Sequence, residues 1–186
     1  MILEGIVTSV NDLGDINVAP MGPIVDESMN TLQLRPFKTS QTFQNLKQHA
    51  CGVFHVVDDV LLLARAAIDR LEATPPTCPA REIRGAVLQD ACRWYEFQVD
   101  SFDEDDDRTR LEAHVVHSGR IRDFFGFNRA KHAVVEAAIL ATRLDFLPQH
   151  QIQQQFQLLR TTVEKTAGPR ELEAFELLER FIGDSL

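Results

Sequence analysis

The chain has 186 residues, a length that suits one domain with an additional element. Apolar residues make up 44% of it and charged residues 25%, which is ordinary for a protein with a packed core. The formal net charge of −9 argues against duplex DNA or RNA as a partner, because such partners require a basic face. One small phosphate needs only a local group of donors, so the charge does not exclude it.

Three cysteines fit neither a disulfide framework nor a C-x-x-C metal pattern, and we interpret them as reduced thiols: Cys51, Cys78 and Cys92. The sequence begins without a basic segment ahead of a long apolar one, as a signal peptide would have. Its longest apolar stretches are too short or too charged to cross a bilayer. We therefore expect a cytoplasmic protein without membrane contact.

The first part of the chain is rich in strand signals. Four segments have the alternation and β-branched content of strands: residues 2–10, 16–20, 31–34 and 52–57. Gly14 suits a turn with positive φ, so the first two strands are predicted to form a hairpin. Ser40 or Thr39 is expected to cap a short helix over residues 41–49.

The middle of the chain adds a helix and a second hairpin. Asp58 and Asp59 are expected to cap an apolar helix over residues 60–71, and a proline-rich loop follows to residue 79. Two long strands, 94–102 and 110–118, flank the acidic run 103–107. This run could bind a cation, but it lacks the glycine and distal glutamate of an EF-hand loop. We therefore interpret it as a solvated hairpin tip.

From residue 128 onward the pattern becomes helical. Three helices are predicted, over residues 130–144, 152–165 and 170–182. The first is apolar nearly all round and should be buried on more than one side. The fold class predicted is α+β: a β-barrel-like core over residues 1–125 and a C-terminal helical unit over residues 126–186, which packs on the barrel, on a second subunit, or on both.

The segment after the third strand has the chemistry of a phosphate site. Thr39, Ser40 and Thr42 present hydroxyl groups at the start of a helix, where free N–H groups and the helix dipole favour an anion. Arg35 adds a planar fork suited to a phosphate, and Lys38 adds a second positive charge. The alternative is that Ser40 only caps the helix and that Arg35 lies on the surface.

Two further segments could contribute to a site. Two prolines and a glycine interrupt the strand in the segment Asn17-Val18-Ala19-Pro20-Met21-Gly22-Pro23. The backbone groups left free there could bind the edge of a flat ring. The alternative is a bulge or a barrel corner. Asn128 is a good helix cap, whereas Arg129 and Lys131 oppose the helix dipole. Either these two cations meet an anion or a partner subunit, or they are ordinary surface residues.

The histidines give no catalytic pattern. His55 lies within an apolar strand, where a hydrogen-bonded structural role is more frequent than a catalytic one. His114 and His117 are three apart on one strand and are expected on opposite faces, so no metal site is predicted. No Ser-His-Asp, Walker-type, dinucleotide-glycine or HExxH pattern occurs.

Together these segments resemble known proteins. The run Thr42-x-x-Asn45-Leu46, then a glycine at 52 and Val53-Phe54-x-Val56, resembles the flavin reductase type of split β-barrel. More closely, three segments resemble an archaeal and bacterial family catalogued as a domain of unknown function, family 447: Asn17-Val18-Ala19-Pro20-Met21-Gly22-Pro23, Leu34-Arg35-Pro36-Phe37-x-Thr39-Ser40-x-Thr42, and Gly126-Phe127-Asn128-Arg129-Ala130-Lys131. The likeness extends over nearly the whole chain.

The resemblance implies an FMN-binding split β-barrel, a homodimer, and FMN at the interface between its subunits. By residue type and position, the predicted cofactor site comprises Arg35, Thr39, Ser40 and Thr42 on the phosphate side, Ala19, Met21 and Gly22 beside the ring, Asn45 on the helix, and also His55, Asn128, Arg129 and Lys131. His55 departs from the flavin reductase pattern, in which a small polar residue, often Asn, closes the strand.

The function expected from the resemblance is that of an FMN-dependent oxidoreductase acting on an unknown small molecule. The alternatives are a flavin-binding carrier, sensor or pathway accessory protein without turnover, and a split barrel that has lost its flavin. The hypothesis without turnover is motivated by the absence of a convincing acid–base pair near the predicted site, whereas the intact Arg35, Thr39, Ser40 and Thr42 weigh against loss of the flavin.

Overall fold

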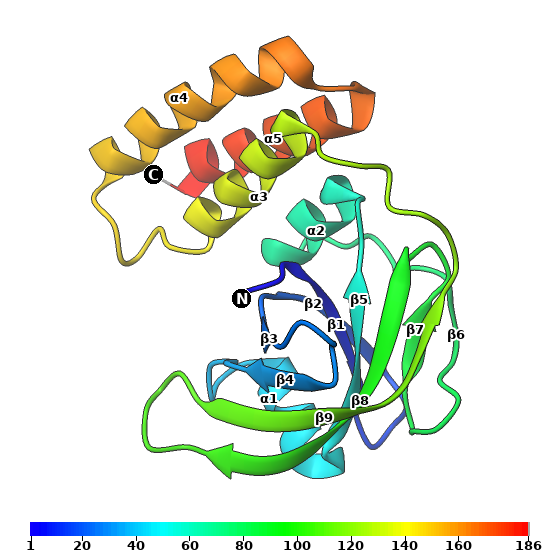
Figure 1. Ribbon diagram of the computed structural model, residues 1–186. Helices are drawn as coiled ribbons and strands as arrows, with labels where there is room; N and C mark the ends of the chain where they lie inside the picture. The colour runs from blue at the N-terminus through cyan, green and yellow to red at the C-terminus, as the bar shows by residue number, and fades with distance from the viewer. Residues whose placement is uncertain (186) are drawn as a thin grey trace. The chain divides into compact units, whose positions relative to one another are not determined.

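The computed structural model describes residues Met1–Ser185, and most of its strands belong to one antiparallel sheet. This sheet has seven strands in the order β2-β1-β5-β8-β9-β4-β3 and curls strongly (Figure 1). Its strands are β1 (Gly5–Val10), β2 (Ile16–Met21), β3 (Ile24–Val25), β4 (Thr31–Leu34), β5 (Cys51–Val56), β8 (Arg93–Asp103) and β9 (Arg110–Arg120). A separate hairpin pairs β6 (Thr77–Pro79) with β7 (Ala86–Leu88), and α1 (Gln41–His49) precedes β5.

The two edge strands of the sheet, β2 and β3, are consecutive in the sequence. Only Gly22 and Pro23 separate them, and such a short connection spans about 11 Å at most. The sheet must therefore curl until its edges approach each other. Further hydrogen bonds fasten β3 to the start of the chain: Val25 N donates to Met1 O at 2.8 Å, and Leu3 N donates to Pro23 O at 3.1 Å.

The strand β2 includes Pro20, as the predicted strand over residues 16–20 does, and the interruption comes only at Gly22 and Pro23. Its register with β1 is unbroken from Ile16, opposite Val10, to Met21, opposite Gly5. A proline lacks an N–H group and is tolerated in a strand at the edge of a sheet, which is the position of β2. The corner falls just after β2, at Gly22 and Pro23, which fits the barrel-corner alternative for this segment.

Alternating apolar side chains fill the inside of the curled sheet. The buried residues of this cluster include Val7, Phe54, Tyr95, Phe97 and Leu111, contributed by four different strands. Residues directly opposite each other on neighbouring strands share a face, and Val7, Phe54 and Tyr95 occupy one such row. Burying each large side chain contributes about 1.5–3 kcal/mol, which makes this row a main source of stability.

A bulge in β9 corrects the prediction for its two histidines. His114 lies opposite Gln98 and His117 lies opposite Glu96, because the register shifts by one residue between these pairs. Since Gln98 and Glu96 share a face of β8, both histidines lie on that face, rather than on opposite faces as predicted. They have different neighbours, however: His114 Nδ1 is 2.8 Å from Asp100 Oδ1.

Four helices form a second compact unit. These are α2 (Val60–Ala67), α3 (Arg129–Ala141), α4 (Gln149–Thr166) and α5 (Pro169–Ser185). The segment Asp58–Glu72 belongs to this unit together with the residues from Phe125 onward, whereas sequence analysis grouped it with the barrel. The reason is the apolar surface of α2, which packs in one cluster with α3, α4 and α5. Among the described residues, no helix is long and apolar enough to span a membrane.

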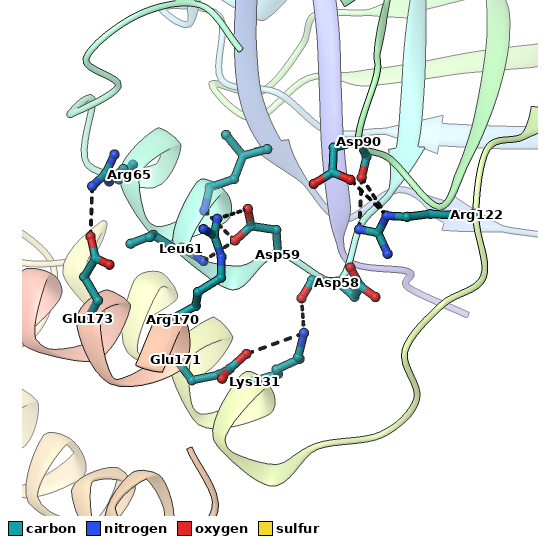
Figure 2. A network of polar contacts seen from close by, with 11 residues as sticks. Asp58, Asp59, Leu61, Arg65, Asp90, Arg122, Lys131, Arg170, Glu171 and Glu173 are labelled. Atoms are coloured by element: carbon teal, nitrogen blue, oxygen red, sulfur yellow. Dashed lines mark hydrogen bonds and ion pairs between the residues drawn. The ribbon is translucent and has the colours of Figure 1, made fainter. Parts of the chain in front are cut away.

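Polar contacts hold the start of α2 within this helical unit (Figure 2). Lys131 Nζ donates a hydrogen bond to the carbonyl of Asp58 and lies 3.5 Å from Glu171 Oε1. Arg170 forms an ion pair with Asp59, whose side chain also caps α2 as predicted. The lysine and the two aspartates are therefore structural residues of the helical unit.

His55 is fully enclosed and uses both ring nitrogens. Nδ1 lies 3.1 Å from Ile6 O, and Nε2 accepts a hydrogen bond from Leu88 N at 3.1 Å. Because Nε2 accepts, the proton is assigned to Nδ1. Burial lowers the pKa of His55 to about 4, although the hydrogen bond to Ile6 opposes the shift. His55 therefore has the structural role, and no ring nitrogen remains for a cofactor.

This buried histidine predicts how stability depends on pH. In the unfolded chain it titrates near 6.5 and in the folded protein near 4, so between these values the unfolded state binds more protons. Neutral His55 contributes about 3 kcal/mol to the free energy of unfolding. This contribution is complete above pH 6.5 and is lost as the pH falls towards 4.

The test compares the wild type with His55→Gln by urea unfolding between pH 7 and pH 4.5. At pH 7 we expect the variant to be less stable by about 1–3 kcal/mol, because a buried donor or acceptor loses its partner. The difference should shrink as the pH falls, since glutamine does not titrate while His55 does. A difference that stays constant with pH would contradict the assignment.

Candidate functional site

The segment between β4 and α1 is fixed in place by the tip of the β8–β9 hairpin. Lys38 N donates to Asp107 O at 3.0 Å, and Thr109 N donates to Pro36 O at 3.0 Å. The buried Thr109 hydroxyl donates to the same carbonyl at 2.7 Å. Residues 36–38 are therefore held by backbone contacts, which sets the position of the helix that follows.

Ser40 caps α1, as predicted. Its Oγ accepts a hydrogen bond from Phe43 N at 3.2 Å and donates to Phe37 O at 2.8 Å. Both roles of the hydroxyl are thus filled within the protein. The N–H groups of Gln41 and Thr42, in the first turn, have no acceptor among the described residues. These open groups and the helix dipole favour an anion at this point.

Cationic and hydroxyl side chains near this helix start also lack partners. The Nε of Arg35 is enclosed and has no hydrogen-bond partner, and its guanidinium forms no ion pair within Met1–Ser185. Thr39 is exposed, and neither its hydroxyl nor the Lys38 ammonium is bonded to another described residue. An enclosed, charged donor without a partner is costly. The donor set therefore fits a phosphate group.

Thr42 and Asn45 point into the protein rather than towards solvent. Asn17 Nδ2 donates to Thr42 Oγ1 at 2.9 Å, and Asn45 Nδ2 donates to Ser9 Oγ at 3.0 Å. Gln41 Nε2 completes this group by donating to Asn45 Oδ1 at 2.7 Å. Since Thr42, Asn45 and Ser9 are all buried, these bonds dock α1 on β1 and β2. The bonds of Thr42 and Asn45 therefore fix the position of α1.

The segment predicted to lie beside a ring occupies the end of β2. Ala19 and Met21 are half-buried and lie on the inner face of the sheet, opposite Val7 and Gly5. Gly22 follows at the corner.

Gly22 is closely surrounded: a Cβ atom there would lie only 2.8 Å from the Glu4 carboxylate and 2.9 Å from Ile2. A larger residue would therefore require its neighbours to move.

The pairing of β3 with β4 directs the two predicted segments towards each other. Ile24 lies opposite Gln33 in antiparallel register. Residues that precede Ile24 therefore run in the same direction as residues that follow Gln33. Gly22 and Arg35 each lie two residues from this pair on the same side, so the corner and the phosphate-type segment share one end of the sheet.

The three predicted residues at the start of α3 differ in whether their side chains are already bonded within the protein. Asn128 Oδ1 accepts a hydrogen bond from Lys131 N at 3.1 Å, and Asn128 Nδ2 donates to Thr166 O at 3.0 Å. Asn128 and Lys131 are therefore engaged within the helical unit. Arg129 is exposed and has no partner among the residues that the structure describes, so only this residue is open to a ligand.

Glu96 is a buried carboxylate that sequence analysis did not identify. Its oxygens accept hydrogen bonds from Arg81 N at 2.9 Å, Glu82 N at 2.7 Å and Trp94 Nε1 at 3.3 Å. Burial favours the neutral acid, but these donors and the nearby His117 together lower the pKa of Glu96. Glu96 is thus an ionised residue that holds the β6–β7 loop, and all its partners are internal.

Two arginines on the inner face of the sheet were also not identified. The register places Val56, Arg93 and Arg120 in one row, and extending the β1–β5 pairing by one residue beyond Ile6 and His55 aligns this row with Gly5 and Met21. The alternation of each strand predicts which of its residues face inward, but only the register shows that Arg93 and Arg120 lie opposite each other. Among the described residues, no three His, Cys, Asp or Glu side chains form a metal-binding group.

Solved structures of similar fold include several flavoproteins. An FMN-bound protein from Methanosarcina mazei, described as a DUF447 protein, matches at 23% identity and a TM-score of 0.83, over 97% of this chain and 94% of that chain. The styrene monooxygenase flavin reductase of Pseudomonas putida S12 matches at 18% identity and a TM-score of 0.52, over 64% of this chain and 80% of that chain. An FMN-binding protein from Thermus thermophilus, with bound 1-cyclohex-2-enone, matches at 12% identity and a TM-score of 0.53, over 64% and 70%.

These similarities establish the predicted fold, a flavin reductase-like split β-barrel with C-terminal helices. No curated protein matches the sequence significantly. Residues 3–122 match the family described as protein of unknown function (DUF447), N-terminal domain, and residues 128–180 match the one described as protein of unknown function (DUF447). The chain therefore belongs to the DUF447 family.

Proposed function

We propose that this protein binds FMN and that the phosphate lies at the start of α1. The observation that carries this proposal is the partly buried Arg35, whose enclosed Nε has no partner, next to a helix start with open N–H groups. Thr39 and Lys38 would add a hydroxyl donor and a positive charge. The FMN bound to the Methanosarcina relative supports the choice of this cofactor.

The flavin ring would lie beside Ala19, Met21 and Gly22. This placement is supported by the shared end of the sheet at which Gly22 and Arg35 both lie, because one FMN must reach both segments. Bound FMN would supply hydride or electron transfer, while the protein binds and orients it. In this arrangement Ser40, Thr42 and Asn45 position the helix, and His55 supports the sheet.

We propose further that the protein is an oxidoreductase acting on a small molecule, and that it works as a homodimer with the flavin between subunits. Arg129, at the start of α3, is exposed and would be available to contact a ligand bound to the second subunit. The flavin reductase among the similar structures supports an oxidoreductase. The second candidate is a flavin-binding carrier, sensor or pathway accessory protein. It is supported by the hydrogen bonds that tie Glu96 and His55 to backbone groups of the protein, so that neither serves as an acid or base for a substrate.

The phosphate role predicts the effect of Arg35→Ala. Loss of a charged hydrogen bond to the phosphate should weaken FMN binding by about 1.5–3 kcal/mol, or roughly 10–150-fold in Kd. Riboflavin, which has no phosphate, should bind the variant and the wild type equally. Arg143→Ala removes an exposed arginine of the helical unit and serves as a control of equal charge. Quenching of flavin fluorescence measures all these constants, and equal losses for FMN and riboflavin would refute the phosphate role.

The oxidoreductase proposal predicts turnover. The FMN-loaded protein is mixed with NADH, NADPH or a reduced deazaflavin without oxygen, and bleaching of the flavin absorbance is followed by stopped flow. Reduction by one donor at about 1 s⁻¹ or faster, the lower end of typical turnover, would support an enzyme. Reduction by every donor many times slower would favour the carrier or sensor.

The dimer proposal is tested separately by sedimentation equilibrium with and without FMN. We expect a mass of two chains in the FMN-loaded protein over a range of concentrations. A monomer at high concentration would refute the dimer without affecting the phosphate assignment.

A further inference from the structure

Arg93 and Arg120 face each other across β8 and β9. They form a directly opposed pair in the antiparallel register, at the end of the strands where Met21 also lies. Directly opposed side chains on one face have Cβ atoms about 5 Å apart, and like charges in this arrangement are destabilising. An anion between the two guanidinium groups would remove the repulsion.

The protein itself provides little compensation for this pair. Arg93 is exposed and forms no hydrogen bond or ion pair within the described residues. Arg120 has one partner, Asp123, at 2.5 Å, and both side chains are largely exposed. An ion pair in such a position is weak, so an incoming anion could replace Asp123.

Other residues of the same face add donors and an apolar surface. Tyr95 lies opposite Ser118, two residues from Arg93 and Arg120 respectively. Tyr95 is only 9% exposed, yet its hydroxyl has no hydrogen-bond partner among the described residues. Val56 lies opposite Arg93 on β5, is only partly buried, and provides apolar surface beside these polar groups.

Two guanidinium groups and two hydroxyl groups on one face form a donor set suited to carboxylate or phosphate oxygens. The nearby apolar side chains suit the carbon skeleton of a small molecule. Arg35 follows Leu34, which lies opposite Leu111 near the start of β9, whereas Arg120 ends that strand. This second cationic group is therefore separate from the proposed phosphate site along β9.

We propose that Arg93 and Arg120 bind the carboxylate or phosphate group of a small anionic substrate of the flavin, with Tyr95 and Ser118 as additional donors. The role of the ligand as substrate rests on the proposed oxidoreductase function. Binding of the anion itself does not, because it depends only on side chains of the sheet. The proposal names a substrate class that the flavin site alone does not specify.

The test uses the FMN-loaded protein with two probes, inorganic pyrophosphate and citrate, which represent the phosphate and carboxylate sources. Isothermal titration calorimetry at constant ionic strength, adjusted with sodium chloride, compares the wild type with the double variant Arg93→Gln/Arg120→Gln. Arg143→Gln is the matched control for the single variants, since it removes one exposed arginine far along the sequence. The single variants Arg93→Gln and Arg120→Gln complete the set.

We expect at least one probe to bind the wild type and the control, with a Kd at least roughly tenfold higher in the double variant. The probe that binds identifies the source, phosphate or carboxylate. The double variant should unfold no earlier than the wild type in probe-free buffer, because the repulsion is gone. This measurement also shows that the variant is folded.

Three results would overturn the proposal. The first is that neither probe binds the wild type at millimolar concentration. The second is equal probe affinity in the wild type and the double variant. The third is a loss of FMN affinity in the double variant as large as in Arg35→Ala, with riboflavin unaffected, because the pair would then hold the cofactor phosphate.

Failure of the proposed function is distinguishable from these results. If the purified protein binds no FMN, the same titrations on the flavin-free protein still decide whether the arginine pair binds an anion. Fluorescence of Trp94, the sole tryptophan and the neighbour of Arg93, gives a second readout in that case.

Discussion

The short connection between the two edge strands is the constraint on which the barrel depends. Since β2 and β3 lie at opposite edges of the sheet yet only Gly22 and Pro23 join them, the sheet cannot remain open. Curling brings the apolar rows of the strands together and gives the barrel its core. It also brings the end of β2 and the segment after β4 to one end of the sheet, so the constraint that forms the fold also assembles the proposed site.

Within the proposed site, polar groups divide into those that hold the structure and those left open. Thr42, Asn45 and Ser40 each form internal hydrogen bonds, and these bonds fix the helix on the strands. Arg35 and Thr39 lack such partners although they lie beside that helix. A ligand site needs this combination, because rigid support lowers the entropy lost on binding while open donors provide the affinity.

The sequence predicted turns and helix caps well, because each depends on a few neighbouring residues. The hairpin at Gly14, which has a φ of 91°, and the helix cap at Ser40 are confirmed, as is the acidic connection between the two long strands. Strands β6 and β7 were not predicted, because each is only three residues long and β6 contains a proline. The role of Gly22 and Pro23 as a corner between two edge strands could not be predicted locally, because an edge is a property of the whole sheet.

The site was harder to predict because its residues depend on register. The phosphate-type segment could be identified from neighbouring residues, but the internal engagement of Asn128 and Lys131 involves partners far away in the chain. Arg93 and Arg120 are 27 positions apart in the sequence, and a register displaced by one residue would place them on opposite faces. A chain with a net charge of −9 nevertheless leaves several cationic groups without partners on the barrel. Acidic side chains are abundant enough to neutralise them, so their open state is best explained by ligands that bring their own negative charge.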